Sequence, residues 1–73
     1  MRIALFGKAV SPDDAEALRA ALDRILALDP QAWISQAYMA ELSDHMNLPA
    51  GLVPYEGEVP QGVDVLLAYG GDG

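Results

Sequence analysis

Two apolar runs constrain the fold of this chain more than any other feature. Residues 3–6 are all apolar, and residues 63–69 are apolar except for Asp64. Strands that are apolar on both faces are typical of the middle of a parallel sheet, where both faces are covered. We therefore predict that the two runs pair as the central strands of a short parallel sheet.

A helix is predicted between these runs, over residues 12–28. Ser11 is a suitable N-cap, Pro12 fits the first helical position, and two Asp residues follow at the positive end of the helix dipole. Apolar residues then recur at helical spacing. Asp29 precedes Pro30 and so disfavours the helical conformation, which ends the helix at Leu28.

The middle of the chain predicts a shorter strand and a second helix. Residues 32–35 form a strand candidate, which we place at an edge of the sheet. A helix should begin at about Gln36, with Tyr38, Leu42 and Met46 on one face, and end near Asn47. Residues 50–62 are rich in Gly and Pro and predict an irregular connection, with a brief extended piece at residues 52–55.

This order of elements predicts one α/β domain over residues 1–73. Strands that alternate with helices imply right-handed parallel crossovers. We expect a three-layer half domain, Rossmann-like or flavodoxin-like, with three strands and two helices.

Composition excludes several function classes. The net charge of −7 makes a nucleic-acid partner improbable. The chain has one His and no Cys, so we expect no metal site built from these ligands. No apolar run approaches the roughly 20 residues of a membrane span, and we expect no membrane contact and a cytoplasmic location.

The candidate site follows the last strand, where Asp72 is set among Gly70, Gly71 and Gly73. Ligands of open parallel sheets bind beyond the carboxyl ends of the strands. Glycines there let a phosphate approach the backbone, and a carboxylate can accept a proton. Asp72 could instead be a turn residue or a ligand of a metal ion. Lys8 is predicted at the same edge and would either reach a phosphate or remain solvated.

The string Gly70-Gly71-Asp72-Gly73 resembles the signature of the NAD kinase family. Residues 1–8 and 52–57 resemble that family as well. The resemblance implies transfer of the γ-phosphoryl group of ATP to the 2′-hydroxyl of the adenosine ribose of NAD, which gives NADP. It implies that Asp72 accepts the proton and touches the nucleotide, that Gly73 contributes backbone near NAD, and that Gly70 and Gly71 cradle phosphate. It also implies a divalent cation, Mg²⁺, and a homo-oligomer.

Two features of the family do not occur in this sequence. The family has a larger β-rich carboxyl-terminal domain and an Asn-Glu or Asn-Asp motif for NAD, so the resemblance implies an amino-terminal part that is inactive alone. Two other functions stay open. One is a different kinase of the wider superfamily, similar to diacylglycerol kinases or phosphofructokinases, and the other is a flavodoxin-like binding module without catalysis.

Overall fold

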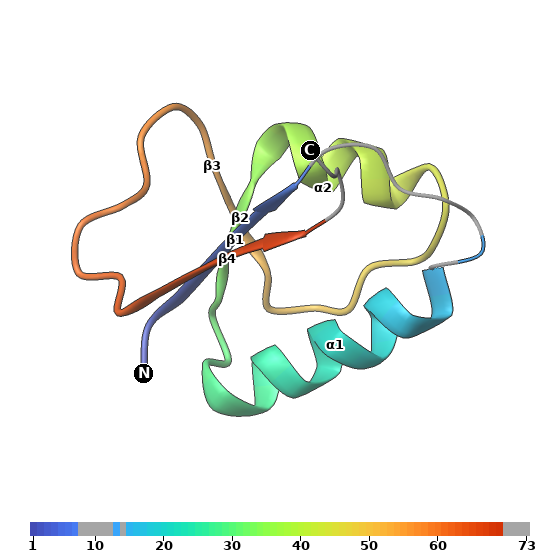
Figure 1. Ribbon diagram of the computed structural model, residues 1–73, viewed down its shortest axis with the longest axis horizontal. Coiled ribbons are helices and arrows are strands. Elements are labelled where there is room, and N and C mark those ends of the chain that lie inside the picture. The colour runs from blue at the N-terminus through green and yellow to red at the C-terminus, as the bar shows by residue number, and fades with distance from the viewer. Residues whose placement is uncertain (8–12, 14, 70–73) are drawn as a thin grey trace.

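The computed structural model describes residues 1–7, 13 and 15–69 (Figure 1). This part of the chain is an α/β structure, as predicted. Its elements in chain order are β1 (Ile3–Gly7), α1 (Ala15–Leu28), β2 (Trp33–Ser35), α2 (Gln36–Ser43), β3 (Val53–Tyr55) and β4 (Val65–Tyr69).

The strands form one parallel sheet of four strands in the order β3-β2-β1-β4. The predicted pairing of β1 with β4 is confirmed. The predicted number of three strands is wrong, because the extended piece at β3 joins the sheet. The predicted edge position of β2 is wrong for the same reason, since β3 pairs with its outer side.

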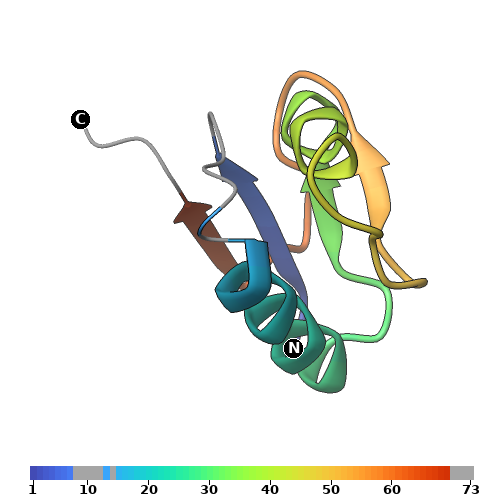
Figure 2. The same ribbon diagram turned by 90° about the vertical axis from the view of Figure 1, so that its right-hand side faces the viewer.

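Both helices lie on the same face of the sheet (Figure 2). In the register of the sheet, Leu5 is beside Ile34 and Leu67, so these three side chains share one face. The hydrophobic core forms on that face from both helices and the sheet, and its fully buried large side chains are Leu5, Leu22, Ile34, Tyr38 and Leu42. The described residues therefore make two layers. The prediction of three layers is wrong for this part of the chain.

The opposite face of the sheet keeps apolar side chains at the surface. Phe6 on β1 is 40% exposed, and Leu66 on β4 is 49% exposed. The connection between β3 and β4 runs on this side of the sheet, away from the helices (Figure 1). Because both faces of these strands are apolar, the sequence predicted that other elements cover both faces of the sheet. The described helices cover only one face.

The helix boundaries follow local sequence signals. α1 ends at Leu28 as predicted. α2 begins at Gln36 as predicted but ends at Ser43, earlier than expected, and Asp44 follows as its C-cap. The predicted stripe on α2 is confirmed for Tyr38 and Leu42, which are buried.

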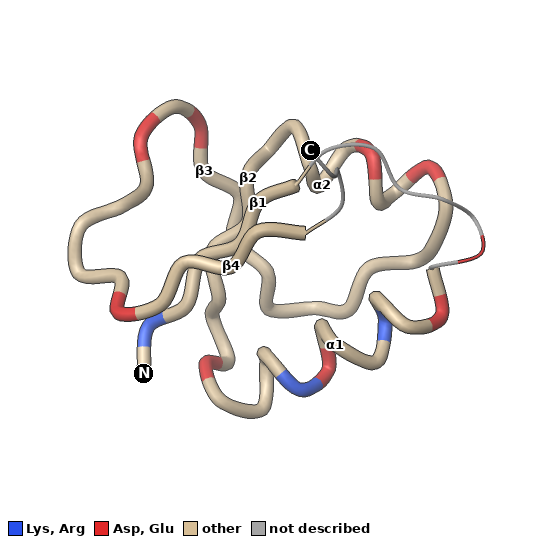
Figure 3. Tube along the Cα trace, viewed as in Figure 1, with Lys and Arg blue, Asp and Glu red and all other residues tan. Residues whose placement is uncertain are grey.

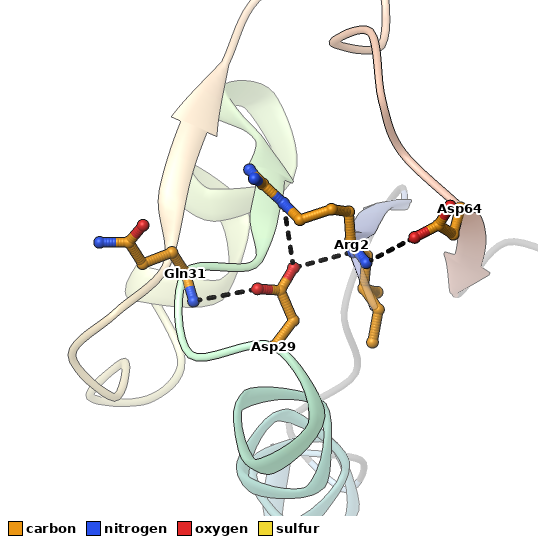
Figure 4. Close-up of polar contacts among 5 residues, drawn as sticks. Arg2, Asp29, Gln31 and Asp64 are labelled. Atoms are coloured by element: carbon orange, nitrogen blue, oxygen red, sulfur yellow. Dashed lines mark hydrogen bonds and ion pairs between the residues drawn. The ribbon is translucent and has the colours of Figure 1, made fainter.

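Asp29 connects the end of α1 to the beginning of two strands (Figure 4). One carboxylate oxygen accepts a hydrogen bond from the Ile3 backbone N–H at 2.8 Å, and the other accepts one from Gln31 N–H at 3.3 Å. The Arg2 Nε lies 3.8 Å from the same carboxylate. Asp29 is 6% exposed, so it is a buried charge whose lone pairs are used by backbone donors.

Asp64 holds β1 to β4 at the same amino edge of the sheet. Its carboxylate accepts a hydrogen bond from Arg2 N–H at 2.9 Å, and its own N–H donates to the Arg2 carbonyl at 2.8 Å (Figure 4). Asp64 and Asp29, from different parts of the chain, thus accept hydrogen bonds from the consecutive backbone N–H groups of Arg2 and Ile3.

The stability of the protein should fall in acid because of Asp29. The hydrogen bond from Ile3 N–H lowers the pKa of this carboxyl below its ordinary value of 3.8; burial opposes this effect, and Gln31 N–H and Arg2 add to it. A lowered folded pKa contributes stability that is fully present above pH 3.8 and is lost as the pH falls through the folded pKa.

Urea unfolding between pH 7 and pH 2 measures this contribution. Asp29→Asn should be less stable than wild type at pH 7, and the difference between the two proteins should shrink below the ordinary pKa. Asp23→Asn is the matched control, because Asp23 pairs with Arg19 at 3.6 Å in an exposed position and should matter little. An Asp29→Asn protein with the wild-type pH dependence would contradict the assignment.

Candidate functional site at the carboxyl edge of the sheet

The order of the strands creates one topological switch point, between β1 and β4. From β1 the chain passes through α1 to β2 and through α2 to β3, and then returns to the other side of β1 as β4. Open α/β sheets bind ligands beyond the carboxyl ends of their strands, at the point where the strand order reverses. The candidate site therefore lies at the ends of β1 and β4.

Gly7 and Tyr69 mark the described limit of this site. They are the last residues of β1 and β4 and are partners in the register of the sheet. Adjacent strands lie about 4.8 Å apart, so β1 and β4 end side by side at one edge of the sheet.

The predicted site residues themselves lie outside the described residues. These are Lys8 after β1 and Gly70, Gly71, Asp72 and Gly73 after β4. The described structure therefore shows the ends of β1 and β4, after which the predicted site residues follow in the sequence.

Gly7 is a glycine because two neighbours approach its backbone closely. A Cβ at this position would lie 2.7 Å from Cε1 and 2.8 Å from Cζ of Tyr38, and it would clash with the Tyr69 carbonyl oxygen. Gly7 is the last residue of β1, and it is a glycine because of this lack of space rather than because of an unusual backbone angle.

The Tyr38 side chain reaches the same place from α2. It is 1% exposed, and its hydroxyl oxygen is buried with no hydrogen-bond partner in the structure. Burial raises the pKa of this hydroxyl above its ordinary value of 10.0, and the nearby Tyr69 raises it further. The group is therefore protonated at neutral pH and is a hydrogen-bond donor without an acceptor.

Two of the described arginines make their polar contacts away from this edge. Arg2 lies at the amino edge beside Asp29, and Arg19 donates a hydrogen bond to the Asn47 carbonyl at 2.8 Å and pairs with Asp23. The connection between β3 and β4 carries only acidic charges, Glu56, Glu58 and Asp64 (Figure 3). Among residues 1–7, 13 and 15–69, no group of three or more acidic, His or Cys side chains can hold a metal ion.

A groove of about 400 Å³ lies between α1 and β4, beside the candidate site. Arg24 and Tyr69 are its polar lining residues, and the rest of the lining is Ala17, Ala20, Ala21, Ile25 and Leu28. These described lining residues include no carboxylate to accept a proton, so we do not assign the chemistry to the groove.

Comparisons with family models, with curated proteins and with solved structures find no match to this chain. The resemblance to NAD kinases therefore has no support beyond the residues that carry it. In the described part of the chain, no helix has the length and apolar character needed to span a membrane.

Sequence reasoning missed the hydroxyl of Tyr38. The helical spacing assigned this residue to packing, which its burial confirms. Periodicity reports which side of a helix faces the core and cannot show where the far end of a long side chain stops. The signal available in the sequence was the polar tip of the largest residue on an otherwise apolar stripe.

Gly7→Ala should destabilise the protein by about 1–3 kcal/mol, because an added methyl group would overpack the contact between β1, β4 and Tyr38. Urea unfolding at pH 7 measures the change. Gly57→Ala is a control with a different cause, since nothing lies within 4 Å of its Cβ position and only its positive φ of 72° opposes a side chain. A Gly7→Ala protein within about 0.5 kcal/mol of wild type would show that the close approach is not rigid.

Proposed function

We propose that this chain is the amino-terminal α/β part of an NAD kinase. The observation that carries the proposal is the switch point between β1 and β4, because the string Gly70-Gly71-Asp72-Gly73 follows β4 directly at this edge. Three residues span at most about 10 Å, so the covalent chain keeps Asp72 near the end of β4. A glycine-rich segment with one acid at this place suits phosphoryl transfer to an alcohol.

Asp72 is proposed to act on the 2′-hydroxyl of the adenosine ribose of NAD. The hydroxyl oxygen attacks the γ-phosphorus of ATP, the bond to the bridging oxygen breaks and ADP leaves, while the hydroxyl proton passes to Asp72. An ordinary carboxylate is a weak base toward an alcohol, so Asp72 accepts the proton late and also orients the attacking oxygen. Gly70, Gly71 and Gly73 leave room for phosphate and ribose.

Mg²⁺ would enter this site with ATP. The described residues offer no group of ligands for the ion. Mg²⁺ usually keeps several waters and binds the phosphates of its nucleotide, so ATP would supply ligands for the ion. The ion would neutralise charge on the transferred phosphoryl group. The acidic chain has few cations of its own, which makes this neutralisation more important. A homo-oligomer and a cytoplasmic location remain parts of the proposal.

Asp72→Asn tests the role of the carboxylate in the full-length protein that contains this chain. NADP formation from ATP and NAD should fall by roughly 10²- to 10⁴-fold, because the proton acceptor is lost, while NAD binding changes only a few-fold. Asp23→Asn is the control, since Asp23 has an exposed side chain on α1 and its substitution should leave turnover unchanged. Full turnover in Asp72→Asn would remove this residue from the mechanism.

The isolated chain of 73 residues should form no NADP. The resemblance assigns the NAD motif to a carboxyl-terminal domain that this sequence does not contain, so the chain alone would lack part of the NAD site. Incubation with ATP, Mg²⁺ and NAD, followed by enzymatic detection of NADP, makes the test, with the full-length protein as the positive control. Phosphorylation of NAD by the isolated chain would show that the further domain is dispensable. A lipid or sugar substrate accepted in place of NAD by the full-length protein would assign it to another kinase of the superfamily.

A further inference from the structure

The two edge strands of the described sheet differ in their protection against pairing. β3 has only three residues, its middle residue Pro54 has no N–H to donate, and Glu56 follows it. Short length, Pro and charge are means by which proteins keep an edge strand from pairing with another chain. β4, at the opposite end of the sheet (Figure 2), has five apolar residues and none of these features. β4 is therefore the edge that is open to a further strand.

The side chains of β4 are partly uncovered on both faces of the sheet. Val65, Leu67 and Tyr69 are half-buried and pack against the margin of the core. Leu66, on the other face, is 49% exposed. Each of these side chains would gain a cross-strand contact from a strand added beside β4.

The helix layer also presents an apolar surface on this side of the molecule. The groove of about 400 Å³ lies between α1 and β4. Its small lining residues come from one side of α1 and are Ala17, Ala20 and Ala21. Small side chains let a second helix approach to about 8 Å between the axes, the short end of the usual range. The groove thus offers a place for a helix next to α1, in the same layer.

This side of the molecule has no excess of charge, although the whole chain has a net charge of −7. β4 has no charged residue, and α1 has two acids and two arginines. Asp64 directly precedes β4, but its carboxylate accepts a hydrogen bond from Arg2 N–H of β1. Acids gather instead on the connection between β3 and β4 and around α2 (Figure 3). Two copies of the chain can therefore meet at α1 and β4 with little of the repulsion expected between other surfaces.

We propose that β4 pairs with β4 of a second copy of this chain and forms the centre of a symmetric dimer. A two-fold axis perpendicular to the sheet pairs the strands antiparallel and joins two sheets of four strands into one of eight. The same axis brings the two α1 helices side by side and antiparallel, with their alanine sides in contact. The proposal uses only α1 and β4, so it does not depend on the kinase activity.

The charges of α1 are the reason to choose a second copy over a foreign strand. Arg24 is exposed and lines the groove, and no ion pair or hydrogen bond to it occurs within the described part of the chain. Glu16 lies about two turns earlier, in the first turn of α1. An antiparallel α1 brings its amino end, with the partner subunit's Glu16, toward Arg24, and symmetry repeats this pair. A second copy thus matches both the apolar strand and the charge beside it.

Sedimentation equilibrium of the chain of 73 residues, over a wide range of concentrations, tests the proposal. The mass should rise from 7.8 kDa toward twice this value and then stop, because a two-fold contact leaves no free β4 edge. Hydrogen exchange of the β4 amides should slow as the dimer forms, since N–H groups on the outer side of the strand become paired.

Leu66→Lys tests the position of the contact. The side chain is 49% exposed, so the added charge stays solvated in the monomer, whereas the dimer brings two such charges close together. The dissociation constant of the dimer should rise by at least about ten-fold, with an unchanged circular dichroism spectrum. Arg24→Glu should raise it by roughly a few-fold, as expected for exposed ion pairs.

Val59→Lys is the matched control. Val59 is also apolar and is 38% exposed, but it lies in the connection between β3 and β4. The substitution makes the same change in charge and should leave the dissociation constant within about two-fold of wild type.

Three results would overturn the proposal. One is a chain that stays at 7.8 kDa at every concentration. Another is a dimer that Leu66→Lys does not weaken, because such a dimer uses a different surface. The third is a mass that continues to rise beyond the dimer, because the contact then does not close. If Leu66→Lys does not fold, hydrogen exchange of the wild type decides, and β4 amides that exchange equally fast in monomer and dimer would reject the contact.

Discussion

The Asp29 carboxylate fixes the strand on which the rest of the structure depends. It follows α1 directly and binds the backbone N–H groups of Ile3, at the beginning of β1, and of Gln31, just before β2. One buried charge thus joins three consecutive elements. β1 has β2 on one side and β4 on the other, so its position decides the order of the whole sheet. A switch point exists only while β1 stays between its two neighbours.

The two edges of the sheet satisfy their polar groups differently. At the amino edge, the Asp64 and Asp29 carboxylates accept hydrogen bonds from the backbone N–H groups of Arg2 and Ile3, and Asp29 also pairs with the Arg2 side chain. At the carboxyl edge, the described residues include a glycine that permits close approach and a buried donor without an acceptor. Structural charge is concentrated at the edge where the fold is held. At the opposite edge, one buried hydroxyl of the described residues has no hydrogen-bond partner.

The sequence predicted the elements better than their arrangement. Apolar runs identified β1 and β4, and Pro30 identified the end of α1, because these signals are local. The predicted edge position of β2 was wrong because β3, its outer neighbour, has only three residues, one of them Pro54, and so resembles a loop in the sequence. The prediction of a third layer was wrong because apolar residues on both faces of a strand do not show what covers the second face. Phe6 and Leu66 remain exposed on that face. The reason for a glycine at position 7 could not be predicted, because it lies in close contacts with Tyr38 and Tyr69, which are both distant in sequence.

The proposed phosphate site lies on a strongly acidic chain, and this needs a physical explanation. The long-range field of a net charge of −7 opposes an anionic nucleotide. Salt screens this repulsion at distances beyond about 10 Å, whereas a hydrogen bond acts at contact. The proposed site would therefore depend on short-range donors and on the Mg²⁺ that accompanies the nucleotide.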